Sequence, residues 1–353
     1  MSRASHRTLG FGIIGAGMIA DFHARAIKDA PNCRLVGVCG RSADRTAEFA
    51  RRHAAHFSTT DPAALFARSD IDVVCIVTPS GAHLEPALEA ARAGKHIVME
   101  KPLEVSLARI DTMLEAVRKA GVVLMPIFQA RTGANAMRMK GALDSGRFGR
   151  LVLASAYVKW HRSASYYRDS WHGTLKLDGG GALINQAIHG IDLLQWFAGV
   201  PAEVFSWNTR RVHTGIEGED TAVGALRFPC GALGSIEATT AAHPGWARRI
   251  EICGEGGSAV LEDDCLVRWD FREPRDGDDA ILAARPDPSM RSGAGAPDQM
   301  SHEGHLRQIT NLAEHLRFGT ALDVDGPEAR KAVAIIQALY RSAESGRSIR
   351  VDA

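Results

Sequence analysis

The sequence predicts an α/β protein with two domains: a doubly wound parallel sheet in the N-terminal part, and a second α/β domain built on a large, mostly antiparallel open sheet. Three observations predict this class. The chain has 353 residues, which is too long for one ordinary core. Short apolar runs alternate with amphipathic helical segments in the first part, and period-two alternation dominates in the second. We therefore expect domains over 1–127 and 128–353.

The predicted strands of the first domain are continuous apolar runs of four or five residues, with helical patterns such as 43–53 and 83–93 between them. Strands of this kind, separated by helices, are typical of a parallel sheet whose two faces are both covered. The five predicted strands cover 11–14, 35–39, 73–77, 96–99 and 122–125.

The second domain alternates apolar and polar residues over longer segments, with Gly and Pro at the turns. This pattern predicts an antiparallel sheet with one face on a core and the other in solvent or in an interface. Residues 272–299 are rich in Asp, Pro and Gly and predict a long loop, after which helical periodicity returns over 302–319 and 327–345. The alternating segments are 150–159, 202–208, 222–228, 231–239 and 249–253.

Composition excludes several classes of protein. Lys plus Arg number 42 against 41 Asp plus Glu, so the chain lacks the basic excess that binding nucleic acid requires. No stretch of about 18 apolar residues is present to span a membrane. Gly15 ends the first apolar run too early for a signal peptide. The six cysteines are scattered without a C-x-x-C pair. Both observations lead us to expect a cytoplasmic protein with free thiols.

The first functional motif is a glycine turn between a strand and a helix. Residues 11–20 have the sequence FGIIGAGMIA, which contains G-x-G-x-x-A. Gly15 allows a tight turn, Gly17 lets backbone N–H groups approach a pyrophosphate, and Ala20 lets helix and strand pack closely. Glycine turns in other α/β proteins can mimic this motif, but the strand–helix–strand context favours a Rossmann dinucleotide-binding domain. The predicted phosphate-binding turn consists of Gly15, Ala16, Gly17, Met18 and Ile19.

The end of the second strand predicts which dinucleotide binds. An Asp or Glu about 20 residues after the glycines binds the ribose 2′-OH of NAD, whereas an Arg accommodates the 2′-phosphate of NADP. This chain has Gly40, Arg41 and Ser42 at that place, with no carboxylate. We therefore expect NADP, with Arg41 and Ser42 as its contacts. NAD is the alternative if Arg41 only faces solvent.

Two further strand ends carry polar motifs. Ligands of open α/β sheets bind beyond the carboxyl ends of the strands, so both motifs are predicted to line one cofactor crevice. Lys101 is expected at the nicotinamide, although an isolated lysine at a strand end is more often a surface residue. The predicted cofactor contacts are Thr78, Pro79 and His83 after the third strand, Glu100, Lys101 and Pro102 after the fourth, and Gln129 in a later loop.

The third motif is a polar stripe on an apolar helix. Three glycines at 179–181 precede a segment in which Asn185, His189 and Asp192 are spaced i, i+4 and i+7. This spacing predicts that they share one helical face. A single histidine there is more often a core residue, but three polar groups in line favour a functional site.

Two patterns that suggest other chemistry are set aside. Residues 302–305 (HEGH) place two histidines three apart with Gly between them, whereas the zinc motif H-E-x-x-H needs a spacing of four. No metal is therefore predicted. Ser80 lies close to His83, but the G-x-S-x-G elbow of a serine hydrolase is absent.

Five motifs occur in order along almost the whole chain. They are G-x-G-x-x-A at 15–20, Thr78-Pro79…His83, Glu100-Lys101-Pro102, Gly179-Gly180-Gly181…His189-x-x-Asp192, and Gly304-His305…Ala338-Leu339-Tyr340-x-Ser342. In this set the chain resembles the Gfo/Idh/MocA family. The resemblance implies an NAD(P)-binding Rossmann domain, a C-terminal domain that contacts substrate, and oxidation or reduction of sugars, sugar derivatives or cyclitols. It also implies Lys101 and His189 as catalytic residues, and a homodimer or homotetramer formed through the C-terminal sheet.

The expected reaction is hydride transfer between C4 of the nicotinamide and a carbinol carbon of the substrate. The hydroxyl proton then needs a base, and the emerging oxygen needs stabilisation. Many family members have Asp four residues before the catalytic His, where this chain has Asn185. Lys101 is therefore the stronger candidate base, with Asn185 and Asp192 as orienting groups. The predicted substrate contacts are Lys101, His161, Tyr167, Arg168, Trp171, Asn185, Gln186 and His189.

Two other functions use the same scaffold by resemblance. One is an NAD-dependent glycosidase, which would cleave its sugar with no net change in the nicotinamide. The other is a non-catalytic regulator that senses a dinucleotide. Retention of both Lys101 and His189 argues against the regulator.

Overall fold

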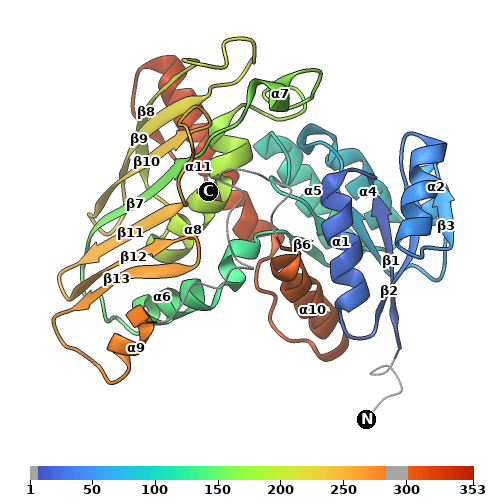
Figure 1. Cartoon of the computed structure of the whole chain (residues 1–353), viewed down its shortest axis with the longest axis horizontal. Helices are drawn as coiled ribbons and strands as arrows, with labels where there is room; N and C mark the ends of the chain where they lie inside the picture. The colour runs from blue at the N-terminus through green and yellow to red at the C-terminus, as the bar shows by residue number, and fades with distance from the viewer. Residues whose placement is uncertain (1–6, 284–300) are drawn as a thin grey trace. The chain divides into compact units, whose positions relative to one another are not determined.

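The structure is a computed structural model that describes residues 7–283 and 301–353 (Figure 1). The described chain divides into two compact units. The first unit contains the described residues up to Gln129 together with Ser301–Ala329, and the second contains the described residues 130–283 together with Arg330–Ala353.

The first unit is built on a six-stranded sheet in which every pair of neighbouring strands is parallel. The strand order β3-β2-β1-β4-β5-β6 is that of a doubly wound dinucleotide-binding domain, so the predicted fold class is confirmed. The sequence prediction missed one strand, β3, which has three residues at the sheet edge. The strands are β1 (Leu9–Ile14), β2 (Cys33–Cys39), β3 (Phe57–Thr59), β4 (Val73–Ile76), β5 (His96–Met99) and β6 (Leu124–Pro126).

Helices follow the strands of this sheet, and local chemistry defines where several of them begin or end. The Asp61 carboxylate accepts a hydrogen bond of 2.9 Å from Ala63 N–H at the start of α3. Gly121 ends α5 in the left-handed conformation, with φ of 65°. The helices are α1 (Met18–Asp29), α2 (Ala43–Arg52), α3 (Pro62–Phe66), α4 (Leu84–Arg92) and α5 (Leu107–Ala120).

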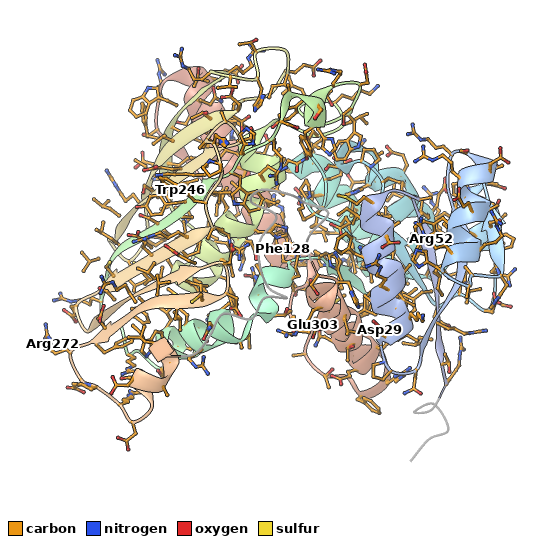
Figure 2. All side chains as sticks on the ribbon, viewed as in Figure 1. Asp29, Arg52, Phe128, Trp246, Arg272 and Glu303 are labelled. Carbon is orange, nitrogen blue, oxygen red and sulfur yellow. The ribbon has the colours of Figure 1, made fainter. Side chains whose placement is uncertain are left out.

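The segment Ser301–Ala329 also belongs to the first unit, although the sequence prediction placed it in the domain 128–353. The reason is the apolar face of α10 (Glu303–Phe318). Its Ile309 and Leu312 are fully buried in the same core as Phe11 of β1. Figure 2 labels Glu303 at the start of α10 and Asp29 at the end of α1, two helices that pack together.

The second unit is built on an eight-stranded sheet of order β13-β12-β11-β7-β10-β9-β8-β14. Only β7 and β10 pair in parallel; the other pairs are antiparallel, which confirms the predicted mostly antiparallel sheet. The strands are β7 (Leu151–Lys159), β8 (Glu203–Thr209), β9 (Thr221–Arg227), β10 (Leu233–Thr239), β11 (Arg249–Gly254), β12 (Gly257–Glu262), β13 (Cys265–Phe271) and β14 (Ile349–Arg350).

Helical segments pack on this sheet. A π-helical turn, η4 (Ala182–Ala187), contacts β9 and β10 and runs into α8 (Ile188–Ala198), which contacts β7 and β11. Leu339 of α11 (Gly326–Ser345) accepts a hydrogen bond of 2.5 Å from the Ser206 hydroxyl on β8. The remaining helices of the unit are α6 (Ala134–Asp144), α7 (Ala164–Tyr167) and α9 (Asp278–Ala283). Over residues 7–283 and 301–353, none of the helices has the length and apolarity that a membrane span needs.

The predicted loop at 272–299 is interrupted by α9, which the sequence prediction did not include. Tertiary contacts explain this helix, because the Asp278 carboxylate in its first turn accepts hydrogen bonds from Arg147 and from the Trp269 indole, the latter at 2.8 Å. The rest of the predicted loop, 284–299, lies outside the described residues.

Candidate active site

The glycine turn lies at the carboxyl ends of β1, β2 and β4. Gly15 has φ of 111°, and its N–H donates to Cys39 O at 2.8 Å. A Cβ at Gly15 would lie 2.7 Å from Val77 O, so only glycine fits. Gly17 begins α1, and a Cβ there would meet no atom within 4 Å, which leaves the turn open to a ligand. These residues therefore fit a dinucleotide phosphate at the helix N-terminus.

A pocket lies against this turn, and α2 supplies half of its lining. Arg41 and Ser42 precede α2 and are exposed, and Thr46 Oγ1 donates to Ser42 O at 2.6 Å to close the first turn. Arg45, one helical turn after Arg41, lines the pocket and was not singled out from the sequence. The lining residues are Ala16, Gly17, Met18, Asp21, Arg45, Glu48, Phe49 and Arg52.

His83 links the two polar motifs of the sheet edge. Its Nε2 lies 2.9 Å from Thr78 O, and its Nδ1 lies 3.0 Å from Pro102 O. The ring is buried, and burial lowers the pKa of His83. The motifs after β4 and β5 are thus held together through His83, as expected for two walls of one crevice. Direct contact of His83 with a cofactor stays a prediction.

Lys101 is the second residue after β5 and is partly exposed. Its backbone N–H donates to Glu100 Oε2 at 3.2 Å, and Pro102 after it is buried. Glu100 itself is buried and bonded to two histidines, His23 and His305, which the sequence prediction did not include. Gln129 follows β6 and lies against Gly304 at the start of α10.

In the second unit, the predicted polar stripe spans the junction between η4 and α8. Asn185 lies in the π-helical turn, whereas His189 and Asp192 lie in α8, and all three are buried. Asn185 Nδ2 donates to Asp178 Oδ1 at 2.5 Å. Asp178 is buried and also accepts a bond of 2.7 Å from Gly173 N–H. A carboxylate missing from position 185 is therefore supplied next to Asn185 by Asp178.

Asp192 forms a buried ion pair. Arg131 Nε lies 2.7 Å from its Oδ2, and Arg131 Nη2 lies 2.6 Å from its Oδ1. The Arg131 guanidinium also lies 5.2 Å from the centre of the Trp196 ring. This two-point contact gives Asp192 a structural partner that the sequence prediction missed; an orienting role for Asp192 in catalysis stays a prediction.

Gln186 extends the polar network. Its Nε2 donates to Asn185 Oδ1 at 2.8 Å and to the Tyr166 hydroxyl at 3.0 Å, and its Oε1 accepts from Arg162 at 2.7 Å. Arg162 is buried and was not predicted. Burial raises the pKa of Tyr166, so its hydroxyl stays neutral at physiological pH.

The other predicted substrate residues lie in the segment after β7. The His161 ring centre lies 5.2 Å from that of His243, with the two rings tilted, and the Tyr167 hydroxyl donates to Thr240 Oγ1 at 2.9 Å. Arg168 is exposed, and Trp171 stacks on His172 at 4.2 Å. Burial raises the pKa of Tyr167 to about 12, which leaves it a hydrogen-bonding group and no base. Their contact with substrate stays a prediction.

Glu219 binds a backbone N–H group of the glycine motif that precedes η4. Its carboxylate accepts from Gly181 N–H at 3.1 Å and Leu183 N–H at 2.7 Å, at the start of the π-helical turn. The Tyr340 hydroxyl donates to it at 3.1 Å. Burial raises the pKa of Glu219 to about 7. A Cβ at Gly180 would collide with the Tyr340 ring, so glycine and tyrosine are required together.

The fold and these sites define a dinucleotide-dependent oxidoreductase. Residues 9–128 match the family described as "Oxidoreductase family, NAD-binding Rossmann fold", and residues 136–260 match the "GFO/IDH/MocA C-terminal domain". The chain belongs to the Gfo/Idh/MocA family.

Relatives and solved structures agree with this family. The chain is 26% identical over 350 residues to myo-inositol 2-dehydrogenase of Thermotoga maritima, covering 97% of this chain and 98% of that protein. It is 31% identical over 289 residues to levoglucosan dehydrogenase of Pseudarthrobacter phenanthrenivorans, covering 72% and 74%. It superposes with a TM-score of 0.87 on the WlbA dehydrogenase of Bordetella pertussis in complex with NADH and UDP-GlcNAcA, at 31% identity over 98% of this chain and all of that one.

Proposed function

We propose that the protein transfers hydride between a nicotinamide dinucleotide and a carbinol carbon of a sugar, sugar derivative or cyclitol. One observation carries this proposal: the Gly15–Gly17 turn and Lys101 lie at the same carboxyl edge of one parallel sheet, where ligands of this fold bind. The enzymes named among the relatives act on inositol and levoglucosan, which are polyhydroxylated rings.

The chain's own residues divide the chemistry between them. The nicotinamide, when bound, accepts or donates the hydride. Lys101 accepts the hydroxyl proton at Nζ, and His189 hydrogen-bonds the emerging oxygen. Asn185, anchored on Asp178, orients a substrate hydroxyl through its amide, and Gln186 does so from the same network. His161, Tyr167, Arg168 and Trp171 supply further substrate contacts.

A spectrophotometric screen tests this function. NAD and NADP are each combined with myo-inositol, levoglucosan and UDP-GlcNAcA, and the nicotinamide absorbance is followed. A steady absorbance change with one sugar-like compound supports the dehydrogenase. Release of a cleaved sugar without net absorbance change would support the glycosidase instead, and binding of dinucleotide without any turnover would support the regulator.

We propose NADP as the preferred cofactor, with NAD as the alternative. Arg41 is exposed two residues after β2, residues 40–42 carry no carboxylate, and Arg45 adds a second guanidinium at the pocket beside Gly17. Arg41→Ala should weaken NADPH binding about ten- to a hundredfold and NADH binding little, because a charge-assisted contact to the 2′-phosphate is lost. Fluorescence titration measures both affinities, with the exposed Arg51→Ala as the control. Equal loss for both cofactors would contradict the preference.

We propose a homodimer or homotetramer that pairs the open face of the second sheet. Cross-strand neighbours Leu153 and Leu233, and Trp207 and Val223, are all large, apolar and about half exposed or more. A stable interface there should bury more than about 1,000 Å². Light scattering should report a multiple of the 38.0 kDa chain, and Trp207→Asp should shift the particle toward one chain. Phe318→Asp on α10 is the control, since Phe318 is exposed in the other unit. A 38.0 kDa wild-type particle would refute the assembly.

We also propose a cytoplasmic location. All six cysteines are free, including the buried Cys75, as expected where thiols stay reduced. Fractionation of cells that express the tagged chain tests this.

A further inference from the structure

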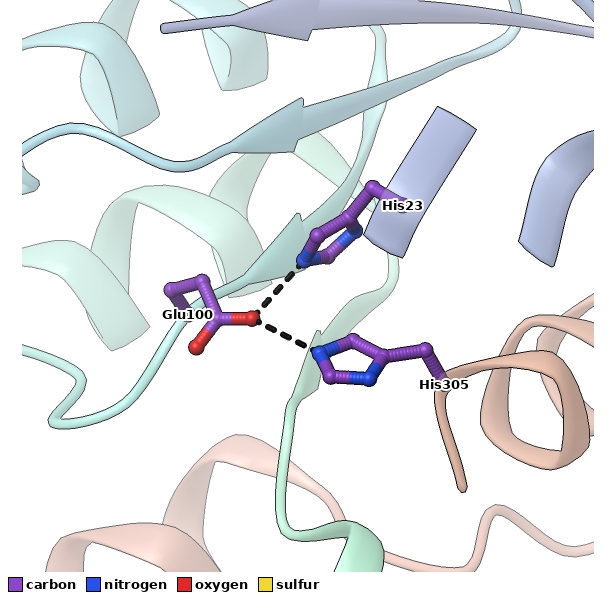
Figure 3. A group of neighbouring side chains, drawn as sticks. All are labelled: His23, Glu100 and His305. Carbon is purple, nitrogen blue, oxygen red and sulfur yellow. Dashed lines mark hydrogen bonds and ion pairs between the residues drawn. The ribbon is translucent and has the colours of Figure 1, made fainter. Parts of the chain in front are cut away.

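Three buried side chains from separate segments of the first unit meet at one oxygen atom (Figure 3). His23 comes from α1, Glu100 follows β5, and His305 comes from α10. His23 Nε2 lies 2.8 Å from Glu100 Oε1, and His305 Nε2 lies 3.2 Å from the same oxygen. The hydride-transfer scheme above uses neither histidine.

The geometry fixes the protons of this cluster. An ionised carboxylate only accepts hydrogen bonds, so each Nε2 must carry the hydrogen. Burial lowers the pKa of His23, which favours its neutral form. Burial alone would raise the pKa of Glu100, but the bonds from His23 and His305 outweigh it and hold that pKa well below its ordinary value. Glu100 is therefore ionised.

Two imidazoles and a carboxylate are also a ligand set that zinc uses. A bound metal would take the Nε2 lone pairs and move each hydrogen to Nδ1. Both Nδ1 atoms are buried, and neither has a hydrogen-bond partner among the described residues, whereas metal-bound histidines almost always donate that N–H to an acceptor. The separations of 2.8 and 3.2 Å are ordinary hydrogen-bond lengths. The geometry thus favours shared hydrogen bonds over a metal.

The cluster is connected directly to Lys101. The second Glu100 oxygen, Oε2, accepts the Lys101 backbone N–H at 3.2 Å. Gly304 explains how α10 reaches this point, because a Cβ there would lie only 2.7 Å from Gln129 Cβ. The Gly304-His305 pair thus lets α10 approach closely and deliver a hydrogen-bond donor to Glu100.

We propose that Glu100, held by His23 and His305, is a positioning residue: it fixes the backbone of Lys101 and keeps a permanent negative charge beside it, which sets the pH at which Lys101 gives up its proton. This inference rests on the proposed function, because Lys101 is its base.

The tautomers test the cluster without any substrate. In protein labelled with ¹⁵N-histidine, the NMR signals of His23 and His305, assigned from His23→Gln and His305→Gln, should show a hydrogen on Nε2 of each ring, with His23 neutral. Elemental analysis should find no bound metal in the purified protein. An Nδ1–H tautomer at either residue, or a stoichiometric transition metal removed by these substitutions, would overturn the proposal.

Variants test the coupling to Lys101. Glu100→Gln keeps the size but removes the charge, so it should lower kcat about tenfold and move the pH midpoint of kcat down by about one unit, with KM and the NADH dissociation constant nearly unchanged. His305→Gln retains a donor near the Nε2 position and should stay close to wild type, whereas His305→Phe should follow Glu100→Gln. His315→Gln, which removes a 2.6 Å contact between His315 Nδ1 and Thr320 O at the other end of α10, is the control.

The outcomes separate the two proposals. If Lys101→Ala turns over normally, the proposed base is wrong whatever Glu100→Gln does. If Lys101→Ala is inactive while Glu100→Gln keeps the wild-type pH profile, only the positioning role fails. Thermal unfolding checks that each variant is folded. If Glu100→Gln does not fold, the difference in pH profile between His305→Gln and His305→Phe tests the positioning role instead.

Discussion

Lys101→Ala should lower turnover by roughly a hundred- to ten-thousandfold, the span of general acid–base catalysis. Lys101 is the second residue after β5, and its backbone N–H is bonded to the buried Glu100. Truncation to alanine therefore removes the proposed proton acceptor without disturbing the strand. The measurement is kcat with the substrate found in the screen, from about pH 6 to pH 10. NADH binding, followed by fluorescence, should change little.

The control for this experiment is Lys95→Ala. Lys95 lies on the same unit just before β5 and bonds to Arg68 O and Ile71 O, away from the strand's carboxyl end. It should keep wild-type turnover if folded. Near wild-type activity of Lys101→Ala across the whole pH range would show that the base is misassigned, and would favour the glycosidase or regulator.

Arg131→Met should destabilise the second unit by about 3 to 5 kcal/mol, the usual cost of leaving one member of a buried ion pair without its partner. The Arg131 and Asp192 side chains are 3% and 0% exposed, and their two bonds are 2.7 and 2.6 Å long. The double variant Arg131→Met/Asp192→Leu should recover much of this loss, because it removes both charges of this pair. Urea unfolding measures the effect.

An exposed pair in the same unit is the matched control. Arg150 and Glu255 lie 2.8 Å apart, but the Arg150 side chain is 87% exposed. Arg150→Met should therefore change the free energy of unfolding much less than Arg131→Met does. Equal effects of Arg131→Met and Arg150→Met would show that the buried pair contributes no more than the surface pair.

The parallel sheet was predictable because its strands are buried on both faces and stand out as continuous apolar runs. β3 escaped prediction because Phe57–Thr59 is a short edge strand with little apolar character. The apolar face of α10 was also predictable, but its partner was not. The spacing of Ile309 and Leu312 identifies the buried face of α10, but it does not indicate which of the two sheets that face packs against.

The positions of Gly15 and Lys101 after strands were predictable, because each belongs to a short motif that follows an apolar run. Partners remote in sequence were not predictable. His305 lies 205 positions from Glu100, and Arg131 lies 61 positions from Asp192. A weak signal existed, since His23 is a polar residue on the apolar face of a helix and Asp178 precedes three glycines. Contacts between residues so far apart in sequence become visible only in the folded structure.

The chain returns to its first unit late, with Ser301–Ala329 after the strands β7 to β13 of the second. Synthesis runs from the N-terminus, and domains generally fold as units as they emerge. The surface of the N-terminal sheet that Ile309 and Leu312 cover therefore stays exposed until most of the other unit has left the ribosome. A chain truncated before residue 301 has an incomplete core, and its Glu100 lacks the hydrogen bond from His305. Only a chain translated beyond α10 can complete the core of the unit that carries Lys101.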